Sequence, residues 1–187
     1  GTTRRLAYGL GAFVIVVAGF MGMRAYGIGP AATLFGTGQL KEKDKLVMTD
    51  FSVTSGDTGL APVVSFAVRS ALEQSAVLTI LDQPTVAGAL KQMEQKPTAH
   101  VDVPLAQGVA LHEGAKGIVD GQVTPVGTGY VLAVRLLTAD SLRVLAAFQA
   151  SGEGPSGVIE AADKVARDLR AKAGESLRSV QNAVPVF

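Results

Sequence analysis

The sequence predicts an α/β (α+β) fold, a mixed sheet with packed helices in the order β-α-β-α-α-β-β-β-α, preceded by one transmembrane helix. Three patterns lead to this fold class. Residues 6–23 carry no charge, residues 130–138 alternate with the period of a strand, and residues 156–180 repeat apolar side chains with the period of a helix. The chain of 187 residues is long enough for one ordinary domain and an additional segment.

The first predicted element is the transmembrane helix, at residues 6–28. The uncharged run Leu6–Met23 spans about 27 Å as a helix, close to the ~30 Å hydrocarbon core of a bilayer. A core helix of a small domain seldom runs this long without a polar face, and the Ala-x-Ala cleavage site of a secretion signal is missing. The expected interfacial anchors are Arg4, Arg5, Tyr8, Arg24 and Tyr26.

The two arginines before the helix favour a cytoplasmic N-terminus. We therefore expect the chain in the inner (cytoplasmic) membrane, with its C-terminal domain in the periplasm. The expected division is a cytoplasmic tail at 1–5, the membrane helix at 6–28, a linker rich in Gly, Pro and Thr at 29–44, an extracytoplasmic α/β domain at 45–182 and a tail at 183–187.

One stripe of the membrane helix consists of small side chains at spacings of four, seven and four. Small residues at such spacings let another helix, a lipid or a flat pigment approach the backbone closely. Gly and Ala are also frequent in membrane helices in general, so the stripe is either a packing face or plain composition. The candidate packing face consists of Ala7, Gly11, Ala18 and Gly22.

The domain is expected to begin with a strand at 46–52, followed by a helix that Asp57 or Thr58 caps. A second strand is expected at 77–81. The apolar stripe of the intervening helix consists of Leu60, Val63, Val64, Ala67, Val68, Ala71 and Leu72.

Two short helices follow, each opened by an Asp with a Pro two residues later, at Asp82 and at Asp102. Gly114 is the expected residue just beyond the second of them, where a left-handed backbone ends a helix. Their inward-facing side chains are expected to be Val86, Leu90 and Met93 in the first helix and Leu105 and Val109 in the second.

Three strands at 117–126, 130–138 and 143–150 are joined by short turns, which predicts an antiparallel meander. The last helix, at 156–180, has the clearest amphipathic pattern, with charged side chains opposite its apolar face. That apolar face consists of Val158, Ile159, Ala162, Val165, Ala166, Leu169, Ala173, Leu177 and Val180.

Composition excludes several classes of protein. The sequence contains no cysteine, which rules out disulfides, thiolate metal sites and a lipid anchor on Cys. Residues 41–187 hold fourteen Lys and Arg against sixteen Asp and Glu, with both signs interspersed. The basic stripe with aromatic neighbours that indicates nucleic-acid binding is missing, so nucleic acid is not an expected partner.

The motifs indicate that the chain is not an enzyme. His100 in a loop and His112 late in a helix lack the spacing of metal ligands. Asp50, Asp57 and Asp120 stand at strand ends or turns, where capping is their usual role. The VGTG at 126–129 precedes a strand, which favours a hairpin turn over a phosphate loop. We expect no catalytic residues, no metal and no cofactor, while contact of a lipid or a pigment with the membrane helix stays open.

Four stretches resemble a known module: KLVMTDF at 45–51, GLAPVVSFAVRSALEQSAVLTILD at 59–82, EGAKGIVDGQVTPVGTGYVLAVRLLTADSLRVLAAF at 113–148 and ESLRSV at 175–180. They are similar to the extracytoplasmic TolB-N-terminal-like (FlgO-like) module that follows the transmembrane helix of bacterial receptor serine/threonine kinases. The resemblance implies an anticodon-binding-domain-like α/β fold and an extracytoplasmic location. The resemblance does not extend to the kinase or to the repeats of those receptors. We therefore expect the chain to be either a free-standing protein or a fragment of a longer receptor.

These observations lead to one main functional hypothesis and two alternatives. The main hypothesis is a non-enzymatic single-pass accessory subunit that docks on a larger integral membrane protein complex and contacts membrane lipids. By analogy alone, a photosynthetic reaction-centre and light-harvesting assembly is one such host. The first alternative is the sensor or ligand-binding ectodomain of a receptor-kinase-type signalling protein, which requires a concave pocket. The second is an envelope protein that binds cell-wall machinery.

Overall fold

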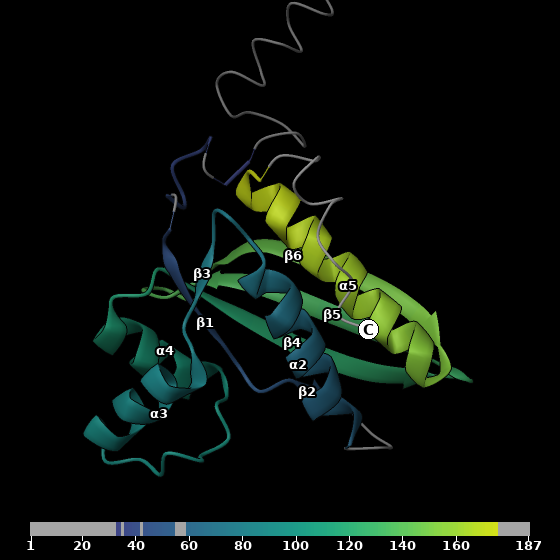
Figure 1. The fold of residues 1–187 in the computed structure, drawn as a ribbon, viewed down its shortest axis with the longest axis horizontal. Coiled ribbons are helices and arrows are strands. Elements are labelled where there is room, and N and C mark those ends of the chain that lie inside the picture. Colours follow the sequence, from purple (N-terminus) through teal and green to yellow (C-terminus); the bar gives the residue numbers. More distant parts are fainter. Residues whose placement is uncertain (1–32, 35, 42, 55–58, 176–187) are drawn as a thin grey trace, which may run out of the picture.

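A six-stranded mixed sheet forms the centre of the computed structural model, which describes residues 33–34, 36–41, 43–54 and 59–175. The order along the sheet is β3-β1-β4-β5-β6, and β2 pairs with β4 beyond the end of β1 (Figure 1). The strand bounds are β1 Lys45–Met48, β2 Ser52–Val53, β3 Thr79–Ile80, β4 Gly117–Val126, β5 Gly129–Thr138 and β6 Val144–Glu153. The predicted mixed sheet and the predicted order of elements are confirmed.

The sheet divides into a parallel and an antiparallel part. Strand β1 is parallel to both of its neighbours, with Leu46 in register with Ile80 of β3 and with Gly117 of β4. Strands β4, β5 and β6 form an antiparallel meander, as the alternating pattern predicts. The β4–β5 connection is a hairpin turn in which Gly127 has a φ of 60°. This confirms the hairpin interpretation of VGTG.

Within the described residues, four helices cover the two faces of the sheet: α2 (Leu60–Glu73), α3 (Gln83–Gln92), α4 (Val103–Glu113) and α5 (Gly154–Ala173). The chain moves from β1 through α2 to β3 on one side, then through α3 and α4 to β4 on the other side. Right-handed crossovers in opposite directions place their helices on opposite faces of the sheet. In Figure 1, α2 and α5 accordingly run side by side, whereas α3 and α4 form a separate pair.

Each face of the sheet has its own hydrophobic core. The larger core lies under α2 and α5 and takes the inward residues of the strands, with the half-buried Val53 of β2 packed against it. The smaller core lies under α3 and α4, where Val47, Ile118 and Leu137 come from the sheet. The expected inward residues of α3 and α4 belong to it, with Val86, Leu90 and Val109 buried and Met93 and Leu105 half-buried.

The predicted caps of the short helices are present. The Asp82 carboxylate accepts the backbone N–H of Thr85 at 2.8 Å, and the Asp102 carboxylate accepts that of Leu105 at 3.0 Å. Gly114 ends α4 with a φ of 68°, in the left-handed region that glycine adopts without strain. The expected cap of α2 at Asp57 or Thr58 lies outside the described residues.

Three details of the prediction are wrong. The strand expected at 46–52 is two strands, because the backbone and carboxylate of Asp50 turn away to bind Val101. The last helix ends at Ala173 instead of residue 180, because Gly174 takes a φ of 118° there. Val63, expected in the apolar stripe of α2, is 42% exposed.

The chain enters the domain at the end where α5 stops. Leu34 and Leu40, inside the range predicted as linker, are buried in the larger core, and the backbone N–H of Leu34 donates to the Lys172 carbonyl. The described part of the chain contains no helix long and apolar enough to cross a bilayer. The predicted membrane helix at 6–28 lies outside the described residues, and the predicted domain boundaries stay predictions.

Candidate functional site

A cavity of the described structure lies at the carboxyl ends of β1 and β3. The connection after β1 leads to α2 on one face, and the connection after β3 leads to α3 on the other face. Neighbouring strands whose connections diverge in this way leave a crevice, which is the usual place for a ligand in an open α/β sheet. The crevice has a volume of about 780 Å³, within the range typical of binding pockets.

We call this cavity the switch-point groove. Its walls come from the segment after β1, the exposed side of α2, the first residue of α3 and the loop before α4. The lining residues are Thr49, Asp50, Phe51, Ser52, Val53, Ala61, Pro62, Ser65, Phe66, Arg69, Glu73, Gln83, Thr98 and His100.

The floor of the groove is fixed by hydrogen bonds between distant segments. The backbone N–H of Asp50 donates to the Val101 carbonyl, and the Asp50 carboxylate accepts the Val101 N–H at 2.8 Å. The backbone N–H of Phe51 donates to the Ser65 hydroxyl of α2 at 3.0 Å. The Phe51 ring is buried over Gly121 of β4, where a side chain would not fit. These contacts hold the loop before α4, the β1 end and α2 together.

The rim of the groove on α2 is apolar and exposed. Phe66 lines the groove and is 58% exposed, and Val63 is exposed less than one turn away. A core-facing helix normally keeps large apolar side chains on its buried stripe. Exposed aromatic side chains beside a concave surface are typical of protein-binding sites.

Arg69 supplies a positive charge to the groove. Its Nη1 donates to the Leu81 carbonyl at the end of β3, at 3.0 Å. Burial lowers the pKa of the Arg69 guanidinium, while the charges of Glu73 and Asp50 oppose that shift. Among the described residues, no carboxylate lies within ion-pair distance of this guanidinium. Arg69 is therefore a half-buried cation in the lining of the groove.

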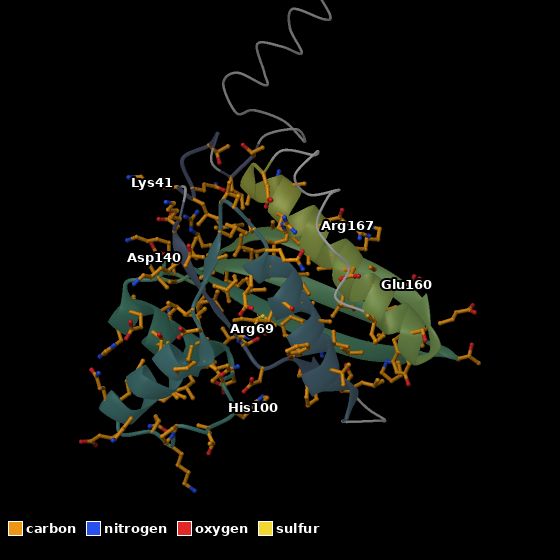
Figure 2. All side chains as sticks on the ribbon, in the orientation of Figure 1. Lys41, Arg69, His100, Asp140, Glu160 and Arg167 are labelled. Atoms are coloured by element: carbon orange, nitrogen blue, oxygen red, sulfur yellow. The ribbon has the colours of Figure 1, made fainter. Side chains whose placement is uncertain are left out.

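The remaining polar groups of the site are weaker candidates. His100 lies at the mouth of the groove with its Nδ1 3.7 Å from the Asp50 carboxylate, and its side chain is 65% exposed. Figure 2 shows His100 and Lys41 at opposite ends of the domain, with Arg69 between them. The His100 end of the groove therefore lies away from the part of the domain where the described chain begins.

Of the residues that the sequence singled out, Asp50 and His100 come together in the groove, whereas His112 and Asp120 lie outside its lining. His112 pairs with its neighbour Glu113 on α4, and neither residue lines the groove. Asp120 lies inside β4, where it accepts the Thr49 hydroxyl and pairs with Arg135 across the β4–β5 ladder, instead of capping a strand end or turn as expected. Within the described ranges, no cluster of three or more His, Asp or Glu could hold a metal ion.

The predictions for the membrane helix concern residues that the structure does not describe. The packing face Ala7, Gly11, Ala18 and Gly22 and the anchors Arg4, Arg5, Tyr8, Arg24 and Tyr26 all lie outside the described residues and stay predictions. Sequence reasoning missed Phe66 and Arg69. One signal was present, because Pro62, Phe66 and Arg69 share a helix face that the apolar stripe does not include.

Solved structures match the fold of this chain. The LpoB C-terminal domain from Escherichia coli superposes with a TM-score of 0.56 at 14% identity, covering 62% of this chain and 86% of that chain. The LpoB C-terminal domain from Salmonella enterica gives a TM-score of 0.51, also at 14% identity and with the same coverage. TolB from Acinetobacter baumannii gives only 0.43 at 15% identity, covering 78% of this chain and 30% of that chain.

No relative of this chain was found by sequence. No family model matches the chain, and no curated protein matches it significantly. At 14% identity, the likeness to LpoB establishes the fold alone. The α/β fold that the TolB-like resemblance implied is thus confirmed in outline, and the receptor-kinase context stays a prediction. None of the solved structures named above supports the photosynthetic host.

Proposed function

We propose that this chain is a non-catalytic domain of the bacterial cell envelope that binds a protein partner through the switch-point groove. The observation that carries the proposal is Phe66, a large aromatic side chain that is 58% exposed on the rim of a cavity of about 780 Å³. Exposing more than half of such a side chain to water costs hydrophobic free energy, which a docked partner recovers. An envelope protein acting on cell-wall machinery agrees with this fold better than a photosynthetic subunit does.

The position of the groove supports the same function. The described chain enters beside the end of α5, where Leu34 contacts Lys172, and the groove lies at the other end of β1. If residues 6–28 anchor the chain in the inner membrane, as the sequence predicts, the groove faces away from that membrane. A tethered domain of this kind presents its binding surface to partners in the periplasm.

The proposal is tested by purifying the full chain from native membranes and identifying the proteins that co-purify with it. We expect the wild-type chain to retain a partner from the cell envelope, and the double variant Val63→Ser, Phe66→Ser to lose most of it. The matched control is Leu111→Ser, because Leu111 is 62% exposed on α4, on the other side of the sheet. Equal retention by the double variant and the wild type would contradict the proposal.

A second candidate function is that of a sensor ectodomain for a small ligand. The specific observation in its favour is the volume of the groove, which suits a small molecule as well as a side chain. Native mass spectrometry of the full chain separates the two: a sensor retains a small molecule that Arg69→Gln releases, whereas a protein-binding domain gives the mass of the chain alone.

A further inference from the structure

We propose that the switch-point groove recognises a carboxylate that stands beside an apolar side chain in a segment of the partner protein. Arg69 binds the carboxylate, and Phe66 packs against the apolar side chain. This inference rests on the proposed function and specifies the chemistry of its binding site.

The donor capacity of Arg69 argues for a carboxylate. A guanidinium has five N–H donors, and one of the nitrogens of Arg69 is engaged with the Leu81 carbonyl. The others have no carboxylate within ion-pair distance among the described residues. The planar fork of Arg matches a carboxylate with two parallel hydrogen bonds, and partial burial strengthens such a charged bond.

The charges around Arg69 argue against a polyanion. Asp50 and Glu73 also line the groove, so the lining carries two carboxylates against the one permanent positive charge of Arg69. A phosphate dianion or a nucleic-acid backbone would be repelled by these carboxylates, because like charges in a half-buried site cost free energy. A single carboxylate pairs with Arg69 and brings one further negative charge, half that of a phosphate dianion, so Asp50 and Glu73 repel it less.

The spacing on α2 defines how the ligand is arranged. Phe66 and Arg69 are three residues apart, so their side chains are neighbours on one helix face, roughly 5–6 Å apart at Cβ. The ligand must therefore place its carboxylate within one or two residues of its apolar side chain. Val63 is exposed outside the groove lining and extends the apolar strip along α2. That extension suits a peptide segment better than a small molecule.

The test uses the full chain in lipid nanodiscs and the fluorescein-labelled tripeptide Ala-Leu-Phe, as the free acid and as the C-terminal amide. We expect fluorescence anisotropy to show the acid binding about tenfold more tightly than the amide, the gain typical of a charge-assisted hydrogen-bonded pair. Arg69→Gln should remove the difference between acid and amide, and Arg69→Lys should retain part of it because the lysine keeps the charge without the fork.

Three controls give each outcome a meaning. Arg167→Gln, on the exposed side of α5, should leave both affinities unchanged. Phe66→Ser should weaken the binding of the acid and of the amide alike. If Arg69→Gln fails to fold because the bond to Leu81 is lost, Phe66→Ser still tests the apolar part of the site. Sodium octanoate, an apolar carboxylate without peptide bonds, should compete poorly.

Equal binding of acid and amide, binding of neither, or tighter binding of octanoate than of the peptide would overturn the inference. If the inference fails while Val63→Ser, Phe66→Ser still loses the envelope partner, the proposed function stands without this recognition chemistry. If the double variant retains the partner as well, the proposed function fails too.

Discussion

Arg170 Nη2 lies 2.6 Å from Glu175 Oε1, and both side chains are 2% exposed. The pair connects α5 to α2. Arg170 donates to the carbonyls of Ala71 and Gln74 at the end of α2, and Glu175 accepts the hydroxyl of Ser75 at 2.7 Å. A buried arginine requires this many partners, because an unpaired charge in the interior is strongly destabilising.

Breaking the Arg170–Glu175 pair should unfold the domain more readily than most substitutions. We expect Glu175→Ala to lower the free energy of unfolding by roughly 3–5 kcal/mol, because it leaves the Arg170 charge buried without its counter-ion. Chemical denaturation followed by circular dichroism measures the loss. The double variant Arg170→Met, Glu175→Ala should be less destabilised than Glu175→Ala alone, and an additive loss would contradict this account.

The floor of the groove depends on a glycine at position 121, because the Phe51 ring occupies the space that a side chain there would need. A Cβ at this position would lie 2.5 Å from atoms of the buried Phe51 ring. Gly121→Ala should therefore displace Phe51 and lower stability by about 1–3 kcal/mol, the usual cost of overpacking a core.

The matched control for this substitution is Gly88→Ala in α3. No atom lies within 4 Å of a Cβ built at Gly88, so this variant gains helix propensity without a clash. Thermal unfolding should show a lower midpoint for Gly121→Ala and an equal or higher one for Gly88→Ala. A Gly121→Ala midpoint at the wild-type value would show that Phe51 does not pack on this strand.

The cap at Asp82 should make stability depend on pH. Hydrogen bonds from Thr85 hold the pKa of the Asp82 carboxyl below its usual value. The folded state therefore binds this proton less readily than the unfolded state, so the stabilisation is present above roughly pH 4 and is lost as pH falls through the lower native pKa. Asp82→Asn should be less stable than wild type at pH 7 and should lose less stability on acidification, as urea denaturation at a series of pH values measures.

The pKa of the Asp163 carboxyl on α5 is shifted in the opposite direction to that of Asp82. Burial raises the pKa of its carboxyl, with Arg167 opposing the shift, so its ionised form disfavours the folded state. Asp163→Asn should retain or increase stability at pH 7. If both Asn variants changed stability in the same direction at pH 7, the assigned causes of the two shifts would be wrong.

Strong local signals were enough to predict most of the fold. The alternation at 130–138 and the Asp caps at Asp82 and Asp102 are encoded within a few neighbouring residues, and the structure confirms them. The predicted strand at 46–52 failed because its interruption depends on Asp50 binding Val101, fifty-one residues away in the chain. Long-range hydrogen bonds of this kind leave no local pattern in a sequence.

The groove could not be predicted for the same reason. It forms where the connections after β1 and β3 diverge, and this divergence is a property of strand order, which local patterns do not determine. Phe66 and Arg69 look like ordinary helix residues until α2 is placed beside the β1 end. Val63 was assigned to the buried stripe because apolar spacing alone cannot distinguish the edge of a stripe from an exposed rim.

The predicted membrane helix is testable independently of the domain. If the stripe of Gly11 and Gly22 is a packing face, replacing both with Leu should weaken assembly with a membrane partner and leave the unfolding of the domain unchanged. Native electrophoresis of solubilised membranes measures the assembly. Unchanged assembly would show that the stripe is plain composition.

The central claim, a protein-binding groove with Phe66 on its rim, is tested most directly by site-specific photo-crosslinking in living cells. A benzoyl-phenylalanine at position 66 should form an adduct with one envelope protein, and a purified sample of that protein should bind the wild-type chain but not Phe66→Ser. The same photo-reactive group at position 111 on α4 should not form this adduct. An identical adduct from both positions, or no adduct from position 66, would contradict the account.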